Sequence, residues 1–187
     1  MDRQQARQFL HSHMENQNLR RHCYAVGIVM KELAKHFGEN ENNWEVAGIL
    51  HDADYEQTKT DTIKHVHTVL EWLQNEDVDQ SIRDAIFSHG WKFVPGCPEP
   101  VNNMQWSLYC CDELTGFIAA VALVRPDRKL ESVTLESIIK KWPKKEFAKG
   151  VDRAQIELCE EKLGIPRDEF IKIALVAMQG ISSELGL

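Results

Sequence analysis

Apolar residues recur along this chain with the spacing of α-helices almost throughout. They return every three or four positions, which places them on one face of a helix, and no segment alternates with the two-residue period of a strand. Residues 19–37 show the pattern most clearly, with a continuous apolar stripe and Gly38 as a stop signal. The sequence therefore predicts an all-α protein.

Caps and helix breakers divide this pattern into segments. We expect helices over residues 3–15, 19–37, 43–54, 62–75, 79–89 and 103–124, then over 134–142, 152–164 and 166–180. Residues 90–101 hold three of the six prolines and two glycines, which predicts a loop. A chain of 187 residues suits one domain. We expect a single domain over 1–187, with a core over about 18–124 and a helical extension over about 125–187.

Composition narrows the class of protein and its surroundings. With 43% hydrophobic and 27% charged residues, the chain is typical of a soluble globular protein. A net charge of −7 argues against nucleic acid as the main partner, and no apolar run is long enough for a membrane span or a signal peptide. The five cysteines form no disulfide framework or zinc ribbon. We expect a cytoplasmic protein with reduced cysteines that binds neither nucleic acid nor membranes.

Several titratable residues fall on helix faces that the pattern predicts to be buried. His22 lies within the apolar stripe of residues 19–37, and His51 follows the apolar run VAGIL. His89 ends a predicted helix with apolar inward positions, and Asp112 shares a face with Leu108. An unpaired buried charge is costly, and even a neutral imidazole needs partners for both nitrogens. A shared metal ion would satisfy all of these groups together.

The dipeptide His51-Asp52 limits where such an ion could sit. Adjacent helical residues diverge by about 100°. Both side chains can therefore reach one ion only if it lies at the edge of the helix, facing a cleft. Any one inward histidine is more often a satisfied core residue, but four groups from four predicted helices favour a common ligand.

These residues also occur in the order of a known motif. The sequence resembles the HD-domain metal-dependent phosphohydrolase superfamily through His22 in LRRHCYAVG, His51-Asp52 in AGILHDADYE and Asp112 in YCCDELTGF. The resemblance covers about residues 18–124. The segments RPDRKL and PKKEFAKGVDR are similar to the C-terminal extension of a bacterial subgroup of predicted HD hydrolases.

The resemblance implies an HD-domain helical bundle and a set of metal ligands. It implies that His22, His51, Asp52 and Asp112 are ligands, and that His65 and His89 hold a second metal or contact phosphate. His67 could take the place of His65. One departure is that many catalytic members follow the dipeptide with glycine and lysine, where this chain has HDADYE.

The resemblance implies the expected activity, and the donor set is consistent with it. Histidines with carboxylates suit one or two ions of Fe, Mn, Co, Ni or Zn. We expect a metal-dependent phosphohydrolase that acts on a nucleotide or another small phosphorylated metabolite, by attack of metal-bound hydroxide on phosphorus. Asp54 or His89 is the expected acid for the leaving oxygen. Asp54 has an alternative interpretation as a helix-terminal carboxylate bonded to a neighbouring Lys or Arg.

Two further groups of residues are candidates for substrate contacts. Residues 125–153 carry nine Lys or Arg and five Asp or Glu, about +4, so the rest carries about −11. The candidate phosphate contacts are Lys129, Lys144, Lys145, Lys149 and Arg153, and the alternative is an exposed basic helix surface. Trp91, Phe93 and Trp106 are candidates for a nucleobase wall, and packing is the more common role of such aromatics.

Two other functions remain open on the same fold. The missing lysine after the dipeptide favours a non-catalytic regulator that binds metal or nucleotide. A pair of iron ions would instead suit a di-iron oxygenase. The sequence carries no signal for an oligomeric state.

Overall fold

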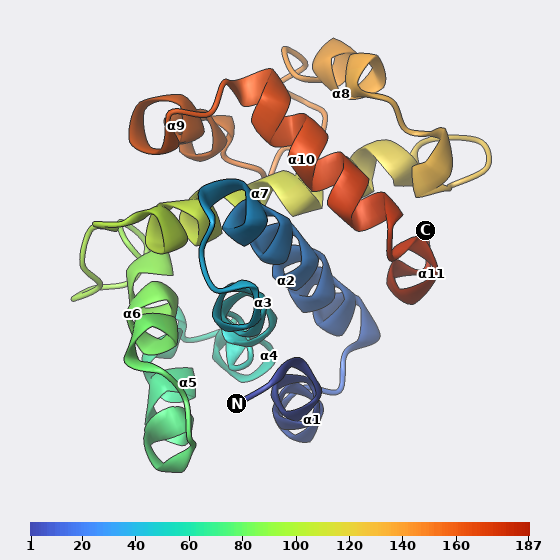
Figure 1. The fold of residues 1–187 in the computed structure, drawn as a ribbon. Helices are drawn as coiled ribbons and strands as arrows, with labels where there is room; N and C mark the ends of the chain where they lie inside the picture. The colour runs from blue at the N-terminus through green and yellow to red at the C-terminus, as the bar shows by residue number, and fades with distance from the viewer.

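The computed structural model describes all residues 1–187, and it contains helices and no strands (Figure 1). The prediction of an all-α fold is confirmed. The α-helices are α1 (Arg3–His13), α2 (Gln17–Phe37), α3 (Glu41–Leu50), α4 (Tyr55–Thr58), α5 (His67–Trp72), α6 (Gln80–His89), α7 (Asn103–Leu123), α8 (Leu135–Lys141), α9 (Arg153–Leu163), α10 (Arg167–Gln179) and α11 (Ser182–Leu185). Three short 3₁₀ helices, Thr62–Lys64, Leu73–Asn75 and Leu130–Ser132, complete the fold.

The predicted helices agree with the structure except around the HD dipeptide. The helix expected over 43–54 ends at Leu50, because the chain tightens into turns in which Ala53 N–H donates to Leu50 O and Tyr55 N–H to Asp52 O. The helix expected over 62–75 is also wrong. It is broken at Val66, whose φ of 69° and ψ of −49° form a γ-turn, with His67 N–H donating to His65 O at 2.8 Å.

Helices α2 and α3 approach each other through two glycines. A Cβ added to Gly48 would lie 2.7 Å from Gly27 Cα, so the two backbones leave no room for a side chain at this position. Small residues at a crossing allow helices to pack at short range. The crossing holds the α2 segment that carries His22 beside the end of α3, where His51 lies.

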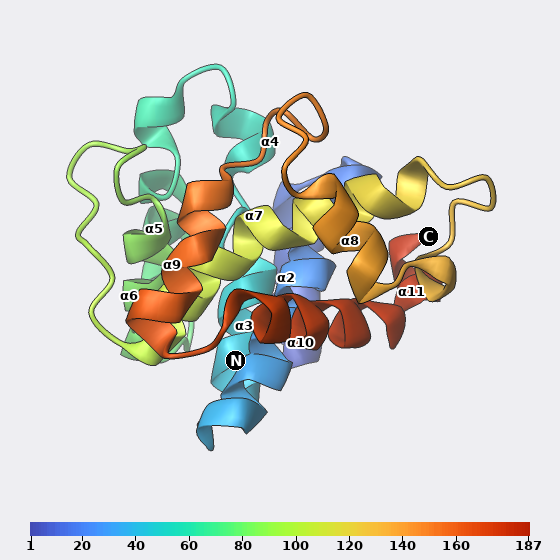
Figure 2. The ribbon, with the colours of Figure 1, turned by 90° about the horizontal axis from the view of Figure 1, so that it is seen from above.

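Helix α7 forms the centre of the bundle. Figure 2 shows it running through the middle of the molecule, and it packs against α2, α6 and α9. By length and composition alone α7 could span a membrane, but 67% of its apolar window is buried inside the protein, as in the core helix of a folded domain. Gln155 ties α9 to this helix by donating from Nε2 to Tyr109 O at 2.6 Å.

The C-terminal helices share their core with the N-terminal ones. A single cluster of 50 buried apolar residues extends from Ala6 to Leu185. Helix α10 lies along α2 and also contacts α7 (Figure 1). Residues 125–187 therefore pack as an integral part of the bundle, around the long helix that carries Asp112.

Candidate metal centre

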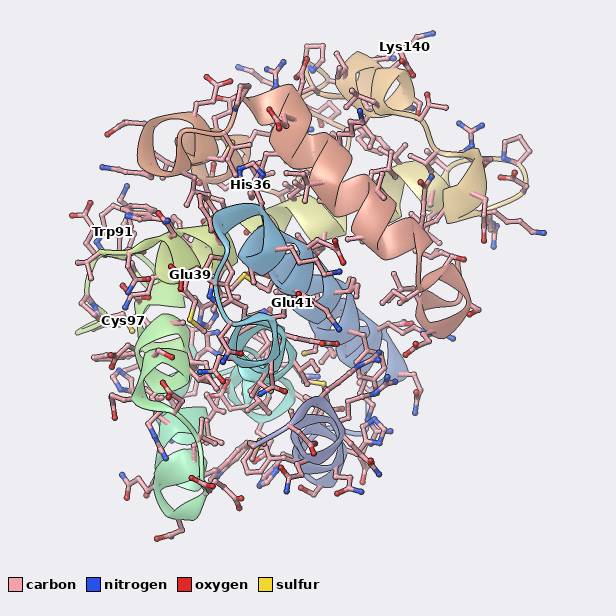
Figure 3. The ribbon with its side chains drawn as sticks, in the orientation of Figure 1. His36, Glu39, Glu41, Trp91, Cys97 and Lys140 are labelled. Carbon is pink, nitrogen blue, oxygen red and sulfur yellow. The ribbon has the colours of Figure 1, made fainter.

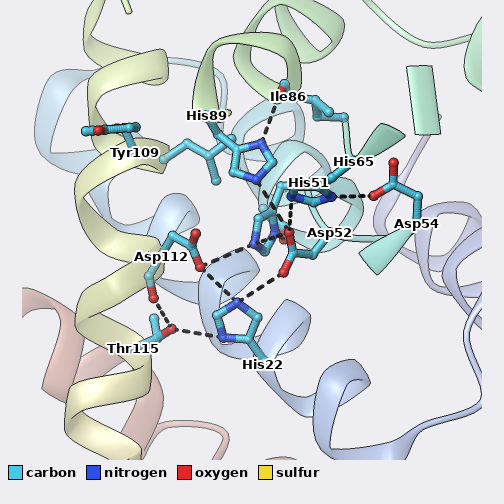
Figure 4. Close-up of polar contacts among 12 residues, drawn as sticks. His22, His51, Asp52, Asp54, His65, Ile86, His89, Tyr109, Asp112 and Thr115 are labelled. Atoms are coloured by element: carbon cyan, nitrogen blue, oxygen red, sulfur yellow. Dashed lines mark hydrogen bonds and ion pairs between the residues drawn. The ribbon is translucent and has the colours of Figure 1, made fainter. Parts of the chain in front are cut away.

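Six side chains from distant parts of the chain meet at one end of α3 (Figure 4). The γ-turn before α5 and the last turn of α6 each contribute a histidine, as do α2 and the end of α3, while one carboxylate follows α3 and the other projects from α7. The six residues are His22, His51, Asp52, His65, His89 and Asp112. All six are candidates that the sequence singled out.

Asp52 lies at the centre of the three buried or half-buried histidines. Its Oδ1 lies 3.3 Å from His65 Nε2, 3.4 Å from His89 Nε2 and 3.7 Å from His51 Nε2. Because α3 ends before the dipeptide, Asp52 occupies a turn and not a helix face. Both side chains of the dipeptide nevertheless reach the cluster, with His51 Nε2 3.7 Å from Asp52 Oδ1.

Asp112 closes the opposite side of the cluster. Its Oδ1 lies 2.9 Å from His22 Nε2 and 3.4 Å from His51 Nε2. Thr115, one turn further along α7, donates from Oγ1 to the carbonyl of Asp112 at 2.9 Å, and the same oxygen lies 3.4 Å from His22 Nδ1. Thr115 is a neighbour of the cluster that the sequence did not single out, since a threonine in an apolar helix carries no distinctive signal.

Backbone carbonyls determine which nitrogen of two histidines faces the cluster. His51 Nδ1 lies 2.8 Å from Gly48 O, and His89 Nδ1 lies 2.8 Å from Ile86 O. A carbonyl oxygen only accepts, so Nδ1 is the donor in each pair. In the neutral rings the lone pair is then on Nε2, which points into the cluster. This arrangement, in which the outer nitrogen donates to a fixed acceptor, is the usual one for metal-ligating histidines.

A buried carboxylate performs the same task for His65. Asp54 is 0% exposed, and its Oδ1 lies 2.8 Å from His65 Nδ1 while its Oδ2 accepts from Val69 N–H at 3.1 Å. Asp54 has no Lys or Arg partner, so the alternative interpretation of a helix-terminal ion pair is wrong. It contacts the opposite nitrogen of the His65 ring from the one that faces Asp52 (Figure 4). The structure makes Asp54 a positioning residue.

The fit of a metal can be tested on the one nitrogen that has no partner. His51 is 0% exposed, and its Nε2 makes no hydrogen bond. An unsatisfied buried polar atom costs free energy, so this nitrogen favours a ligand that accepts its lone pair. Donor atoms around one ion at about 2.1 Å lie roughly 3 Å apart, close to the 2.9 and 3.4 Å that separate Asp112 Oδ1 from His22 and His51. The residues present fit a divalent metal.

Two groups of donors converge tightly enough to hold an ion. One comprises His22, His51 and Asp112, and the other His51, Asp52 and His89, with the ligand atoms of each group within 4.8 Å of one another. His65 adjoins the second group through Asp52. The cluster therefore offers donors for one ion or for two neighbouring ions.

The charged groups in the cluster strongly shift the pKa values of its histidines. Burial disfavours the charged form of His51, but the carboxylates of Asp52 and Asp112 outweigh this and raise its pKa to about 9. Burial likewise opposes the charged form of His65, while hydrogen bonds to Asp52 and Asp54 raise its pKa to about 10. Without metal, the protons held by His51 and His65 therefore balance the negative charge of the carboxylates. A divalent cation would replace these protons, and its binding would release them.

The histidines also lower the pKa values of both carboxyl groups. Burial would raise the pKa of Asp52, but His51, His65 and His89 hold it well below its usual range. Burial opposes ionisation of Asp112 in the same way, and His51 and His22 lower its pKa. Both carboxylates are therefore ionised and able to serve as ligands at any pH near neutrality.

The other candidate residues lie outside the cluster. His67 is exposed, with Nε2 3.2 Å from Pro95 O, so the structure places His65 and not His67 against Asp52. Trp91, Phe93 and Trp106 surround Tyr109, with ring centroids 5.5, 6.4 and 5.9 Å from the Tyr109 ring. Figure 3 shows Trp91 at the outer edge of the bundle, and these three aromatics pack against one another and Tyr109.

The basic candidates differ among themselves. Arg153 donates from its guanidinium to the carbonyls of Trp142, Lys144 and Phe147 at 2.6–3.1 Å, which holds the loop before α9 in place. The lysine side chains form no ion pairs and are exposed; they are Lys129, Lys144, Lys145 and Lys149. The structure brings none of these five residues into contact with the cluster.

Comparison with known proteins identifies the architecture around this site. Residues 19–105, a little under half of the chain, match the family model of the HD domain, which is an all-α fold. The match includes His22, His51, Asp52, His65 and His89, and it ends before Asp112, which the fold of α7 brings to the site. No curated protein matches the chain significantly.

Proposed function

We propose that this protein is a metal-dependent phosphohydrolase that acts on a nucleotide or another small phosphorylated metabolite. The observation that carries the proposal is the convergence of four histidine Nε2 atoms on two ionised carboxylates, where the buried Nε2 of His51 makes no hydrogen bond. Such a mixed nitrogen and oxygen donor set suits Fe, Mn, Co, Ni or Zn.

The donors divide naturally between two ions. His22, His51, Asp52 and Asp112 would hold one divalent metal, and His65 and His89 would hold a second together with Asp52. When bound, a divalent metal activates water at neutral pH and offsets the negative charge of a phosphoryl group. Asp54, Gly48 and Ile86 keep the histidine rings oriented, so that little reorganisation accompanies binding.

The substrate would approach from the side of His22 and Asp112. Their side chains are 25% and 21% exposed, whereas His51 is fully buried. His89 already donates from Nδ1 to Ile86 O and directs Nε2 at Asp52, which suits a ligand better than the acid that we expected from the sequence. Protonation of the leaving oxygen would then come from water at the open side of the cluster.

Metal content and phosphate release together test this function. Protein purified without chelator or affinity tag should contain one or two transition-metal ions per chain and release phosphate from a panel of nucleotides and sugar phosphates. His51→Ala and Asp52→Asn should lose both properties, while the exposed His67→Ala should keep both. Metal-dependent turnover that persists in the His51 and Asp52 variants, with folding verified by circular dichroism, would refute the proposal.

A di-iron oxygenase is the second candidate, because His65 and His89 give Asp52 two further nitrogen neighbours and so provide for a pair of ions. Oxygen uptake that requires reduced iron and an organic substrate, with no phosphate release, would favour it over the hydrolase. A non-catalytic regulator would instead bind metal or nucleotide without forming product.

We further propose a cytoplasmic location, since all five cysteines are unpaired and four are buried.

A further inference from the structure

A cavity opens beside the exposed edge of the candidate metal centre. It has a volume of about 380 Å³ and is bounded by α2, α7, the end of α10 and the segment 185–187. Two of its lining residues, His22 and Thr115, also belong to or adjoin the metal cluster. Its volume lies within the range of small-molecule sites. A ligand in this cavity would therefore contact the side of the cluster from which solvent reaches the metal ligands.

A glycine in the middle of α7 forms part of the wall of this cavity. Gly116 lies one turn beyond Asp112, and a Cβ added there would meet only Val151 Cγ2, at 4.0 Å. Glycine destabilises a helix interior relative to alanine. Gly27 and Gly48 are explained by the contact between α2 and α3, whereas packing gives no reason for glycine at Gly116. Gly116 does line the cavity, so a large side chain at this position would change the shape of the wall.

The wall is aliphatic and lacks an aromatic platform. Half of its twelve residues are hydrophobic, and none is Phe, Tyr or Trp; the apolar ones are Ala25, Ala119, Leu123, Met178, Leu185 and Leu187. Nucleobases in protein sites usually stack on aromatic side chains. Trp91 and Trp106 pack around Tyr109 and Tyr55 lies against His65, and none of these aromatic residues lines this cavity. The wall therefore favours an aliphatic group over a nucleobase.

One unpaired cation stands at the same cavity. The Arg21 guanidinium makes no ion pair or hydrogen bond within the protein, and it lies against Gly186, where an added Cβ would be 2.6 Å from one of its nitrogens. A cation without a partner next to an apolar wall complements a ligand that is anionic and also carries hydrocarbon.

We propose that this cavity binds the organic group of the substrate and that this group is aliphatic, so that the protein prefers phosphomonoesters of short aliphatic alcohols to nucleotides. The inference rests on the proposed phosphohydrolase function, which supplies the reaction at the adjacent cluster. It assigns Gly116 to specificity and Arg21 to attraction of the anionic ester.

The test is a series of n-alkyl phosphates, from methyl to butyl, with adenosine monophosphate for comparison. With the metal-loaded protein, kcat/KM should rise about fourfold per added methylene, equivalent to about 0.8 kcal/mol, and butyl phosphate should exceed adenosine monophosphate at least tenfold. Gly116→Leu should abolish the dependence on chain length. Arg21→Gln should lower kcat/KM for every ester by a similar factor. Lys140→Leu, on the outer side of α8 (Figure 3), is the control that should change nothing.

Binding of n-alkylphosphonates, measured by calorimetry on the same proteins, separates this inference from the function on which it rests. Tighter binding with chain length, lost in Gly116→Leu, supports the cavity even if no ester is hydrolysed, in which case only the hydrolase proposal fails. Equal affinity for all chain lengths, or a dependence that survives in Gly116→Leu, overturns the cavity proposal even if phosphate is released.

Discussion

Asp54 and His65 form a buried pair in which Asp54 Oδ1 lies 2.8 Å from His65 Nδ1. Both oxygens of Asp54 accept, the second from Val69 N–H at 3.1 Å, so the carboxylate joins the end of the HD turn to the first turn of α5. The opposite nitrogen of His65 faces Asp52 at 3.3 Å. The pair therefore holds a candidate ligand in place across the break in the chain at Val66.

Replacement of Asp54 by asparagine should weaken metal binding without unfolding the protein. An amide has one acceptor oxygen, so Asp54→Asn can satisfy either His65 or Val69 N–H but not both. Loss of such a supporting carboxylate typically lowers metal affinity about 10–100-fold. Calorimetric titration of the metal-free protein would measure this. The control is Asp61→Asn, because Asp61 is paired only with the exposed Lys64. Equal affinities in the two variants would contradict the positioning role.

The two neighbouring histidines should differ sharply in their effect on metal content. His65→Ala removes a nitrogen that faces Asp52, so we expect the bound metal to fall, by one ion per chain if two are present. His67→Ala removes an exposed ring whose contacts are Pro95 and Phe87, and metal content should not change. Elemental analysis of both variants and of the wild-type protein would show which of the two histidines binds metal. A loss in His67→Ala with retention in His65→Ala would reverse the assignment.

Two alanine substitutions of helical glycines should change stability in opposite directions. The Cβ of Gly48→Ala would meet backbone atoms of Gly27 at 2.7–2.8 Å, and the helices must separate, so we expect a loss of about 2–4 kcal/mol. In Gly116→Ala the new Cβ has open space, and the higher helix propensity of alanine should add about 0.5–1 kcal/mol. Urea unfolding of the metal-free proteins measures both. A stable Gly48→Ala variant would show that the α2–α3 crossing is looser than described.

Protein stripped of metal by a chelator should lose stability as the pH rises above neutrality. The pKa values of His51 and His65 are about 9 and 10 in the folded chain, above the value of about 6.5 for an unfolded histidine. Between these values the folded state binds more protons than the unfolded state, so the free energy of unfolding falls with pH. The contribution is complete below about pH 6.5 and is lost as the pH passes through 9 to 10.

Thermal unfolding at pH values between 6 and 10 would show this trend, and His51→Gln should reduce it. Metal affinity should change in the opposite direction, because the ligands must lose their protons before they bind. A melting temperature of the metal-free protein that rises between pH 7 and 9.5 would contradict the ionisation described for the cluster.

The pattern of apolar residues was sufficient to predict a helix wherever one helix face is apolar over several turns. The ranges expected for α2, α6 and α7 agree with the structure within about two residues, because burial of a continuous stripe governs those segments. The same reasoning predicted that His22 and Asp112 face inward, and their side chains are largely buried, at 25% and 21% exposed. The match of residues 19–105 to the HD domain agrees with the resemblance found in the motif order.

The pattern of apolar residues predicted the wrong secondary structure in two segments that form the candidate site. Residues 51–54 form turns and residues 62–64 form a short 3₁₀ helix in place of the expected α-helices, and Val66 adopts a positive φ that β-branched residues rarely take. Local preference loses here to long-range contacts: the Asp54 carboxylate bonds to His65 and Val69, and Val66 packs without exposure against the turn at Gly90. Such contacts join residues too far apart for a local pattern to reveal.

The amino-acid sequence by itself determined the order and chemical type of the candidate ligands, the all-α class and the lack of a disulfide framework. It could do so because periodicity and residue chemistry are local properties. Only the tertiary structure decided that His65 and not His67 faces Asp52, that Asp54 supports a histidine, and that a cavity without aromatic residues adjoins His22. These are relationships between helices, set by how the side chains of α2, α3 and α7 pack, and packing depends on all of the chain at once.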